Sequence, residues 1–355
     1  MKLNLYKYFA VFMAFTLFAC GGGGAIAPEA TAEVVATEAP ATEVAEVIPT
    51  DEPIVHKIIP SAPAQTLGNA SDNEETGSFE NRDVDFGDDF PRNRYERPFT
   101  TGMVDYLPEI DIVKFSIGDD DNFFYVTMTL GGLVTPGQAP SGHYAIEVDG
   151  DVDGRGEFII IVNPPFGSEW SVDGVQIYAD ENLDIGGENL VRNDTNYTGD
   201  GYEKLVFDSG RGADPDLGWA RFVDGASPAI EIAFSKQIFP SSPRFMWSVW
   251  ASATPFNTAT FNLHDTTTHE LAGSPDKENS LYPIKGIVAV DNSCRVPVGF
   301  TATGSEPLGC PVAGLPPNDP EYVPPPGTPP NFCDLYPVIC SGIIIVLPPP
   351  PPPVP

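Results

Sequence analysis

Short stretches of the chain alternate between apolar and polar residues, which is the pattern of a β-strand with one buried face. In FFYVTMTL, residues 123–130, every second residue from Phe124 to Leu130 is apolar and would lie on one face. RFMWSVWAS, residues 244–252, is apolar on both faces and is predicted to be a central strand. Further strands are expected at residues 157–162, 229–234 and 286–290.

Turn-rich pieces separate these strands, and no long amphipathic helix is evident. The pattern therefore predicts an all-β fold, an antiparallel β-sandwich over residues 82–293. A single helical turn, capped by Ser235, is expected after the strand at residues 229–234.

Both ends of the chain lack this alternation. Residues 20–81 are rich in Ala, Thr, Glu, Val and Pro, as in APEATAEVVATEAP. Such a segment buries too little apolar surface to offset the entropy of ordering, so a disordered acidic tether is predicted. Residues 294–340 combine Cys with Pro, and residues 341–355 end in a proline run that favours a polyproline II tail.

The first residues resemble the signal peptide of a bacterial lipoprotein. Lys2 and Lys7 precede the apolar stretch FAVFMAFTLFA, which is too short to span a bilayer comfortably. The stretch ends in LFAC, which resembles a lipobox, and GGGG follows. The resemblance implies that residues 1–19 are removed and that lipid on Cys20 anchors the exported chain at the bacterial cell surface or membrane. The alternatives are an ordinary signal peptide or a free Cys in a membrane-bound segment.

Four cysteines follow the predicted sandwich. An even number of cysteines in an exported chain implies disulfides. Three pairings are open, and sequential pairing is favoured because it closes the shortest loops: Cys294–Cys310 and Cys333–Cys340.

The chain is strongly acidic, with 50 Asp and Glu against 18 Lys and Arg and a formal net charge of −32. This balance argues against nucleic acid as a partner, because phosphates are bound by Lys and Arg. It would repel anionic lipid surfaces and attract divalent cations.

One loop between two predicted strands concentrates carboxylates. In YAIEVDGDVDGRGEFIII the pattern D-x-D-x-D-G-x-x-E places acids at loop positions 1, 3, 5 and 9, which are Asp149, Asp151, Asp153 and Glu157. Calcium prefers six to eight oxygen ligands, and alternating spacing turns successive side chains toward one centre. Gly154 allows a sharp turn, and the carbonyl of Arg155 would be a further ligand.

This loop is not an EF-hand, because the position of the closing Glu holds Ile160. It resembles the calcium loops of β-hairpins, as in the integrin α propeller. The alternative is a polar hairpin of Asp-rich turns without an ion.

A second run, DENLDIGGE, repeats the spacing but lacks Gly at the sixth position. It is a candidate second metal site with Asp180, Asn182, Asp184 and Glu188. DSGRGADPD is looser and is predicted to be an Asp-rich turn.

A search for catalytic motifs is negative. The sequence has no G-x-S-x-G, H-E-x-x-H or S-x-x-K, and its four histidines include His264 and His269, whose spacing suits neither a helix face nor a strand face. We therefore predict no enzymatic activity.

Tryptophans are the candidate platforms for a ligand, since aromatic faces stack on sugars. Trp247 and Trp250 lie on opposite faces of one predicted strand, so one could face outward, or both could be buried beneath covering loops. The candidate platforms are Trp170, Trp219 and Trp250. For any single Trp, a place in the core is the alternative.

FSIGDDDNFFYVTMTLGG, followed by GHYAIEVDGDVDGRGEF, resembles the early part of sandwich domains related to family 9 carbohydrate-binding modules and DOMON-like domains. The resemblance covers about residues 111–162 and implies a jelly-roll-like sandwich, with sugar bound in some members and haem in others. No Met/His pair is placed to favour haem. The later part, including LAGSPDKENSLYPIKGIVAVDNSC, resembles uncharacterised secreted bacterial proteins, which imply no activity.

Together these features predict a cell-surface lipoprotein with a calcium-stabilised, non-catalytic β-sandwich that binds glycans. A structural or adhesive envelope protein without a small ligand is the alternative, and a glycoside-active hydrolase is a weaker one.

Overall fold

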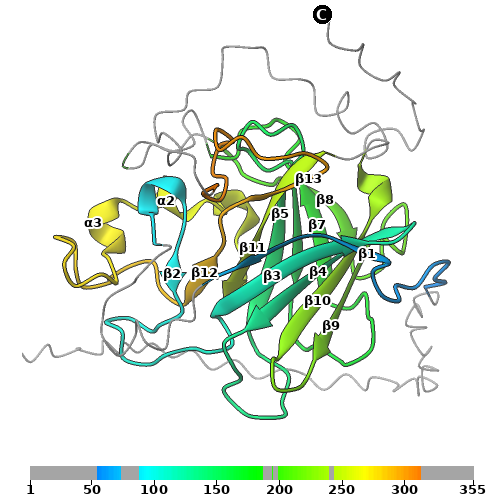
Figure 1. Ribbon diagram of the computed structural model, residues 1–355, viewed down its shortest axis with the longest axis horizontal. Helices are drawn as coiled ribbons and strands as arrows, with labels where there is room; N and C mark the ends of the chain where they lie inside the picture. The colour runs from blue at the N-terminus through cyan, green and yellow to red at the C-terminus, as the bar shows by residue number, and fades with distance from the viewer. Residues whose placement is uncertain (1–53, 73–87, 187–193, 195–198, 240–243, 313–355) are drawn as a thin grey trace, which may run out of the picture. The chain divides into compact units, whose positions relative to one another are not determined.

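The structure is a computed structural model that describes residues 54–72, 88–186, 194, 199–239 and 244–312 (Figure 1). These residues belong to one compact unit, which begins at Glu52. Several predicted features lie outside the described residues, namely the signal peptide with Cys20, Glu188, Cys333, Cys340 and the polyproline tail.

The prediction of an all-β sandwich is confirmed. Two antiparallel sheets pack face to face (Figure 1). The first has five strands in the order β1 (Gln65–Ser71), β3 (Ile112–Asp119), β4 (Phe123–Leu130), β10 (Ala229–Ser235) and β9 (Gly218–Val223).

The second sheet has eight strands. Their order is β2 (Glu96–Arg97), β12 (Val290–Asn292), β11 (Phe245–Ser252), β5 (His143–Asp149), β6 (Phe158–Val162), β7 (Val175–Ala179) and β8 (Lys204–Asp208), and β13 (Val296–Val298) also pairs with β11. The short helices are η1 (Phe90–Arg92), η2 (Lys236–Ile238), η3 (Thr258–Thr260), α2 (Leu263–Thr266) and α3 (His269–Ala272). In the described part of the chain, none of the helices has the length and apolar content to cross a membrane.

The inner faces of both sheets form one hydrophobic core. The expected apolar face of β4 lies in this core, as do Ile230, Ile232 and Phe234 of β10. Every residue of β11 is buried, as predicted for a central strand, because the other face of this sheet is also covered. Trp247 lies in the core between the sheets, whereas Trp250 lies in a second cluster beneath the covering segments.

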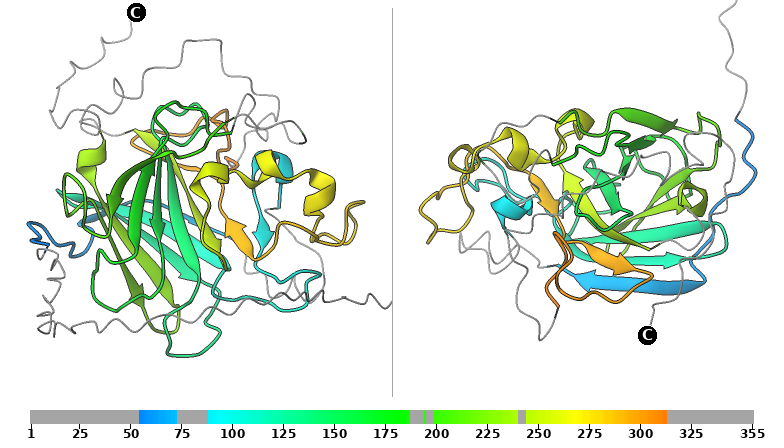
Figure 2. Two further views of the ribbon diagram at one scale, coloured as in Figure 1. Left: turned by 180° about the vertical axis from the view of Figure 1, so that it is seen from behind. Right: turned by 90° about the horizontal axis from the view of Figure 1, so that it is seen from above.

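The covering layer is formed by residues 88–106 and 252–290, which lie together at one side of the sheets (Figure 2). Buried Arg97 links them: its guanidinium pairs with Asp88 and donates to the carbonyls of Ala272, Gly273 and Ile287. Because this layer buries the outer sheet face, polar side chains there are removed from water and need partners.

The capped helical turn expected after residues 229–234 is confirmed. Ser235 caps η2, and its side chain accepts a hydrogen bond from the Gln237 N–H at 3.2 Å. The predicted strand at residues 286–290 is wrong, because β12 begins only at Val290, after Ala289 with a φ of 55°.

The predicted limits of the sandwich are too narrow at both ends. The composition of residues 65–71 predicts part of a disordered tether, but these residues form β1 and pair with β3. Residues 296–298, assigned to the Cys/Pro-rich segment, form β13 on β11. Pairing with an open sheet edge supplies order that the composition of these segments alone does not.

Candidate metal centre

The acidic loop connects β5 with β6. The last paired residues are Val148 and Phe158, and the Glu157 N–H donates to the Val148 carbonyl at 2.9 Å. Asp149 and Glu157 therefore stand at the two ends of the loop, side by side. Asp149 also shares a strand face with Glu147, and this face lies under the covering layer.

The four predicted carboxylates converge. One oxygen from each of Asp149, Asp151, Asp153 and Glu157 can be chosen so that all lie within 4.8 Å of one another. Oxygens around a calcium ion at about 2.3–2.6 Å are at most roughly 5 Å apart, so the spacing matches such a shell. Asp149 and Glu157 are buried, while the other two reach the surface.

Backbone amides arrange the loop around Asp149. Its Oδ1 accepts from the N–H of Val152 at 2.7 Å and of Asp153 at 3.2 Å, and its Oδ2 accepts from Gly154 at 2.9 Å. Gly154 has a φ of 96°, which explains the predicted need for glycine. Val152 has a φ of 65°, unusual for a β-branched residue, and its hydrogen bond to Asp149 helps to hold it there.

Burial and mutual repulsion favour protons on the carboxylates of the loop. Burial, opposed by the charge of Arg295 and aided by the neighbouring carboxylates, raises the pKa of Asp149 to about 7. Burial and the charge of Asp153 raise the pKa of Asp151 to about 6. Burial, followed by the charges of Asp149 and Asp151, holds the pKa of Glu157 well above its usual range. A bound cation would reverse this cost, so binding is expected to release protons.

Arg295 is a part of the centre that sequence reasoning missed. It is buried, and its Nη1 lies 2.8 Å from Asp149 Oδ2 while its Nη2 lies 3.1 Å from Glu147 Oε2. The Tyr202 hydroxyl donates to Glu147 Oε1 at 2.8 Å. Arg295 is 146 residues from Asp149, so local spacing gave no signal for this pair.

The Arg155 carbonyl remains a prediction as a ligand. The contacts of Arg155 hold the loop in place: its N–H donates to Asp153 Oδ1 at 2.7 Å, and its Nη1 donates to the Ile185 carbonyl at 2.7 Å.

The candidate second site is described only in part. Buried Asp180 accepts from the N–H groups of Leu183 and Ile185, at 2.7 and 2.8 Å, and thus folds its own turn. The Asn182 amide donates to Asp200 at 2.9 Å instead of joining Asp180. Because Glu188 lies outside the described residues, a second metal site stays a prediction.

A different acidic group is brought together by the fold. Oxygens of Asp72, Glu96 and Asp291 also lie within 4.8 Å of one another. Asp291 pairs with Glu96 across β12 and β2, and its Oδ2 accepts from the Ile112 N–H at 2.5 Å. These acids come from three distant segments, so no motif in the sequence could have indicated the group.

The candidate tryptophan platforms are mostly covered. Trp219 is 3% exposed with His56 against its ring at 4.6 Å, and Trp250 is 2% exposed beside Phe261 at 4.7 Å. This burial contradicts an exposed stacking face at these two residues. Trp170 is half-buried, and the Arg221 guanidinium lies over its ring at 4.5 Å.

A half-open pocket of about 390 Å³ lies beside Trp250. Its wall combines apolar groups, such as Phe256 and Ile287, with hydroxyl and amide groups, such as Thr260 and Asn257. None of the described residues that line it is charged. Phe90 stacks on His269 with ring centroids 4.7 Å apart and meets His264 edge-on at 6.4 Å.

One of the two predicted disulfides is confirmed: Cys294 and Cys310 are bonded, with Cα atoms 4.9 Å apart. The pairing of Cys333 with Cys340 lies outside the described residues.

No protein family matches this chain, and neither a curated protein nor a solved structure matches it.

Proposed function

We propose that this chain is an exported, lipid-anchored protein whose β-sandwich is a non-catalytic module stabilised by calcium. The observation that carries the proposal is the convergence of four carboxylates at the β5–β6 loop, two of them buried. Four like charges in this space favour a counter-ion, and oxygen-only ligands favour a hard cation. The membrane anchor rests on the lipobox resemblance at Cys20.

The role of the ion is structural in this proposal. The loop lies at a strand connection, its buried Asp149 pairs with Arg295, and neither Asp149 nor Glu157 is among the residues that line the pocket beside Trp250. The charge-free lining described for this pocket does not offer the carboxylate pair that glycoside hydrolysis requires.

Isothermal titration of the chain carrying Cys20→Ser, which blocks lipid attachment, tests the calcium site. We expect a dissociation constant of about 10⁻⁴–10⁻³ M, as for extracellular calcium modules, and weaker binding of magnesium. Absence of heat with calcium at millimolar concentration would refute the site.

Glycan binding is the second candidate, and the pocket beside Trp250 favours it. Aromatic groups with hydroxyl and amide groups and no charge suit a neutral polyhydroxyl ligand. Because Trp250 is almost fully covered, the ligand would enter beside Phe256 and Thr260 and not stack on an open indole face. A glycan array in calcium, repeated with Phe256→Ala, tests this candidate. Absence of binding in the array would leave the structural or adhesive role as the function.

A further inference from the structure

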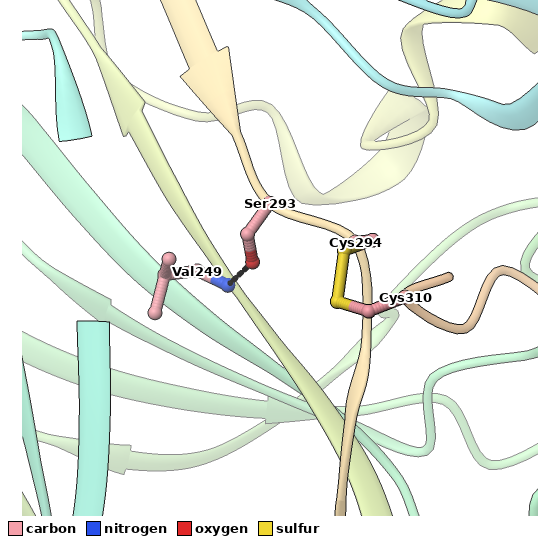
Figure 3. Close-up of a disulfide and its surroundings, with 4 residues drawn as sticks. All are labelled: Val249, Ser293, Cys294 and Cys310. Atoms are coloured by element: carbon pink, nitrogen blue, oxygen red, sulfur yellow. Dashed lines mark hydrogen bonds between the residues drawn. A yellow bond between two sulfur atoms is a disulfide. The ribbon is translucent and has the colours of Figure 1, made fainter. Parts of the chain in front are cut away.

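The segment that carries Arg295 is anchored to the sandwich on both sides of this residue. Before it, the Ser293 N–H donates to the Val249 carbonyl at 3.0 Å, and the Ser293 hydroxyl accepts from the Val249 N–H at 3.1 Å (Figure 3). After it, β13 pairs with β11, with Val296 opposite Trp247. The backbone of Arg295 therefore has little freedom relative to the central strand.

The disulfide closes a loop around the same residue. Cys294 bonds Cys310 (Figure 3). The Arg295 N–H donates to the Leu308 carbonyl at 3.0 Å, and the Cys310 N–H donates to the Arg295 carbonyl at 2.8 Å. These links point the side chain under the covering layer. There it meets Glu147 and Asp149 and is 3% exposed.

This placement puts a fixed positive charge against one of the carboxylates that would bind calcium. Arg295 contacts the same Asp149 oxygen, Oδ2, that accepts from Gly154. A buried charge at hydrogen-bond distance interacts strongly with a neighbouring carboxylate, both when the loop holds a cation and when it does not. Without metal it offsets the repulsion among the carboxylates, and with metal it repels the incoming cation.

We propose that Arg295, held by the Cys294–Cys310 disulfide, is a built-in counter-cation that keeps the loop folded without metal and holds its calcium affinity low. This inference rests on the calcium site proposed above. It assigns the disulfide-closed segment a role in setting how calcium is bound, beyond that of a simple cross-link. Glu147 belongs to the same unit, because its carboxylate also pairs with the Arg295 guanidinium. The negative charge of Glu147 therefore weakens the effect of Arg295 on Asp149 and on a bound cation.

Calcium titrations of five chains test the inference, all carrying Cys20→Ser. Arg295→Met removes the charge and keeps much of the length, so calcium affinity should rise at least tenfold while the metal-free melting temperature falls. Arg295→Lys keeps the charge and should bind calcium within about threefold of the unaltered chain. Glu147→Gln retains an acceptor for Tyr202 but leaves the guanidinium to Asp149 alone, so affinity should fall.

The opposite signs separate this role from a purely structural one. A residue that only positions Asp149 would weaken calcium binding when it is replaced by Met, and that result would overturn the inference. If Arg295→Met requires calcium to fold, the fall in affinity of Glu147→Gln still decides, and unchanged affinity there overturns the inference. The double variant Cys294→Ser with Cys310→Ser should change calcium affinity in the same direction as Arg295→Met. Unchanged affinity in this variant would show that the disulfide has no part in setting calcium affinity. An unaltered chain that binds no calcium would overturn the calcium site and this inference together.

Discussion

Neutralising Asp151 should make the metal-free protein more stable, although it removes a proposed ligand. Asp151 lies within 4.8 Å of three other carboxylate oxygens, and its Oδ1 accepts from the Asp153 N–H at 3.1 Å. Asp151→Asn keeps an oxygen for that hydrogen bond and removes the charge. Two unit charges at this separation repel by about 3 kcal/mol at an effective dielectric constant of about 20, and partial protonation and Arg295 reduce this value.

We therefore expect Asp151→Asn to raise the free energy of unfolding in EGTA by roughly 1–3 kcal/mol. For a domain of this size, each kcal/mol changes the melting temperature by about 2–4 °C. In calcium this difference in stability between the variant and the unaltered protein should shrink. At a ten- to hundredfold excess over the dissociation constant, the unaltered protein gains about 1.4–2.7 kcal/mol, and the variant should lose most of this gain.

Thermal melts by circular dichroism, with EGTA and with 10 mM calcium, measure both effects on the chain with Cys20→Ser. Asp121→Asn is the matched control, since it removes one charge from an exposed turn outside the loop and should leave the calcium response unchanged. A variant at Asp151 that melts below the unaltered protein in EGTA and keeps its full calcium response would refute the reasoning.

Two further predictions follow from the same geometry, and a third follows from the lipobox resemblance. The native metal-free loop holds protons that the unfolded chain releases between about pH 4 and pH 7, because the pKa values of Asp149 and Asp151 are raised to about 7 and about 6. Stability in EGTA should therefore fall as pH rises through this window, and melts that rise instead between pH 5 and pH 7 would contradict it. Gly156→Ala should destabilise the protein by about 2 kcal/mol or more and weaken calcium binding, because its Cβ would lie 2.0 Å from the Tyr202 hydroxyl and 2.8 Å from Glu147 Cγ. Gly167→Ala, whose Cβ would meet only backbone atoms at 4.0 Å, should be nearly neutral in urea unfolding. Cys20→Ala should move the protein from the membrane to the soluble fraction, and unchanged fractionation would refute the lipid anchor.

The loop and most strands could be predicted because their signals are local. Alternation along residues 123–130 and 229–234 reflects one buried face, and the spacing of Asp149, Asp151, Asp153 and Glu157 is carried by a single hairpin. A period of two residues fixes which side chains share a face, and a short loop keeps its ends together. The sequence alone was therefore enough to predict the sandwich class and the four acids as one group.

The local residue pattern does not predict which distant segments cover a sheet face, so only the tertiary structure determines which side chains are buried there. Residues 65–71 have the composition of a tether and form a strand because the edge of β3 is open to them. Trp219 is covered by His56, which is distant in the sequence. Trp250 is covered by Phe261, which follows a turn whose direction the residue pattern does not predict. Arg295 reaches Asp149 only because β13 and the disulfide place it beneath the sheet, so the charge that balances the loop depends on contacts between distant segments.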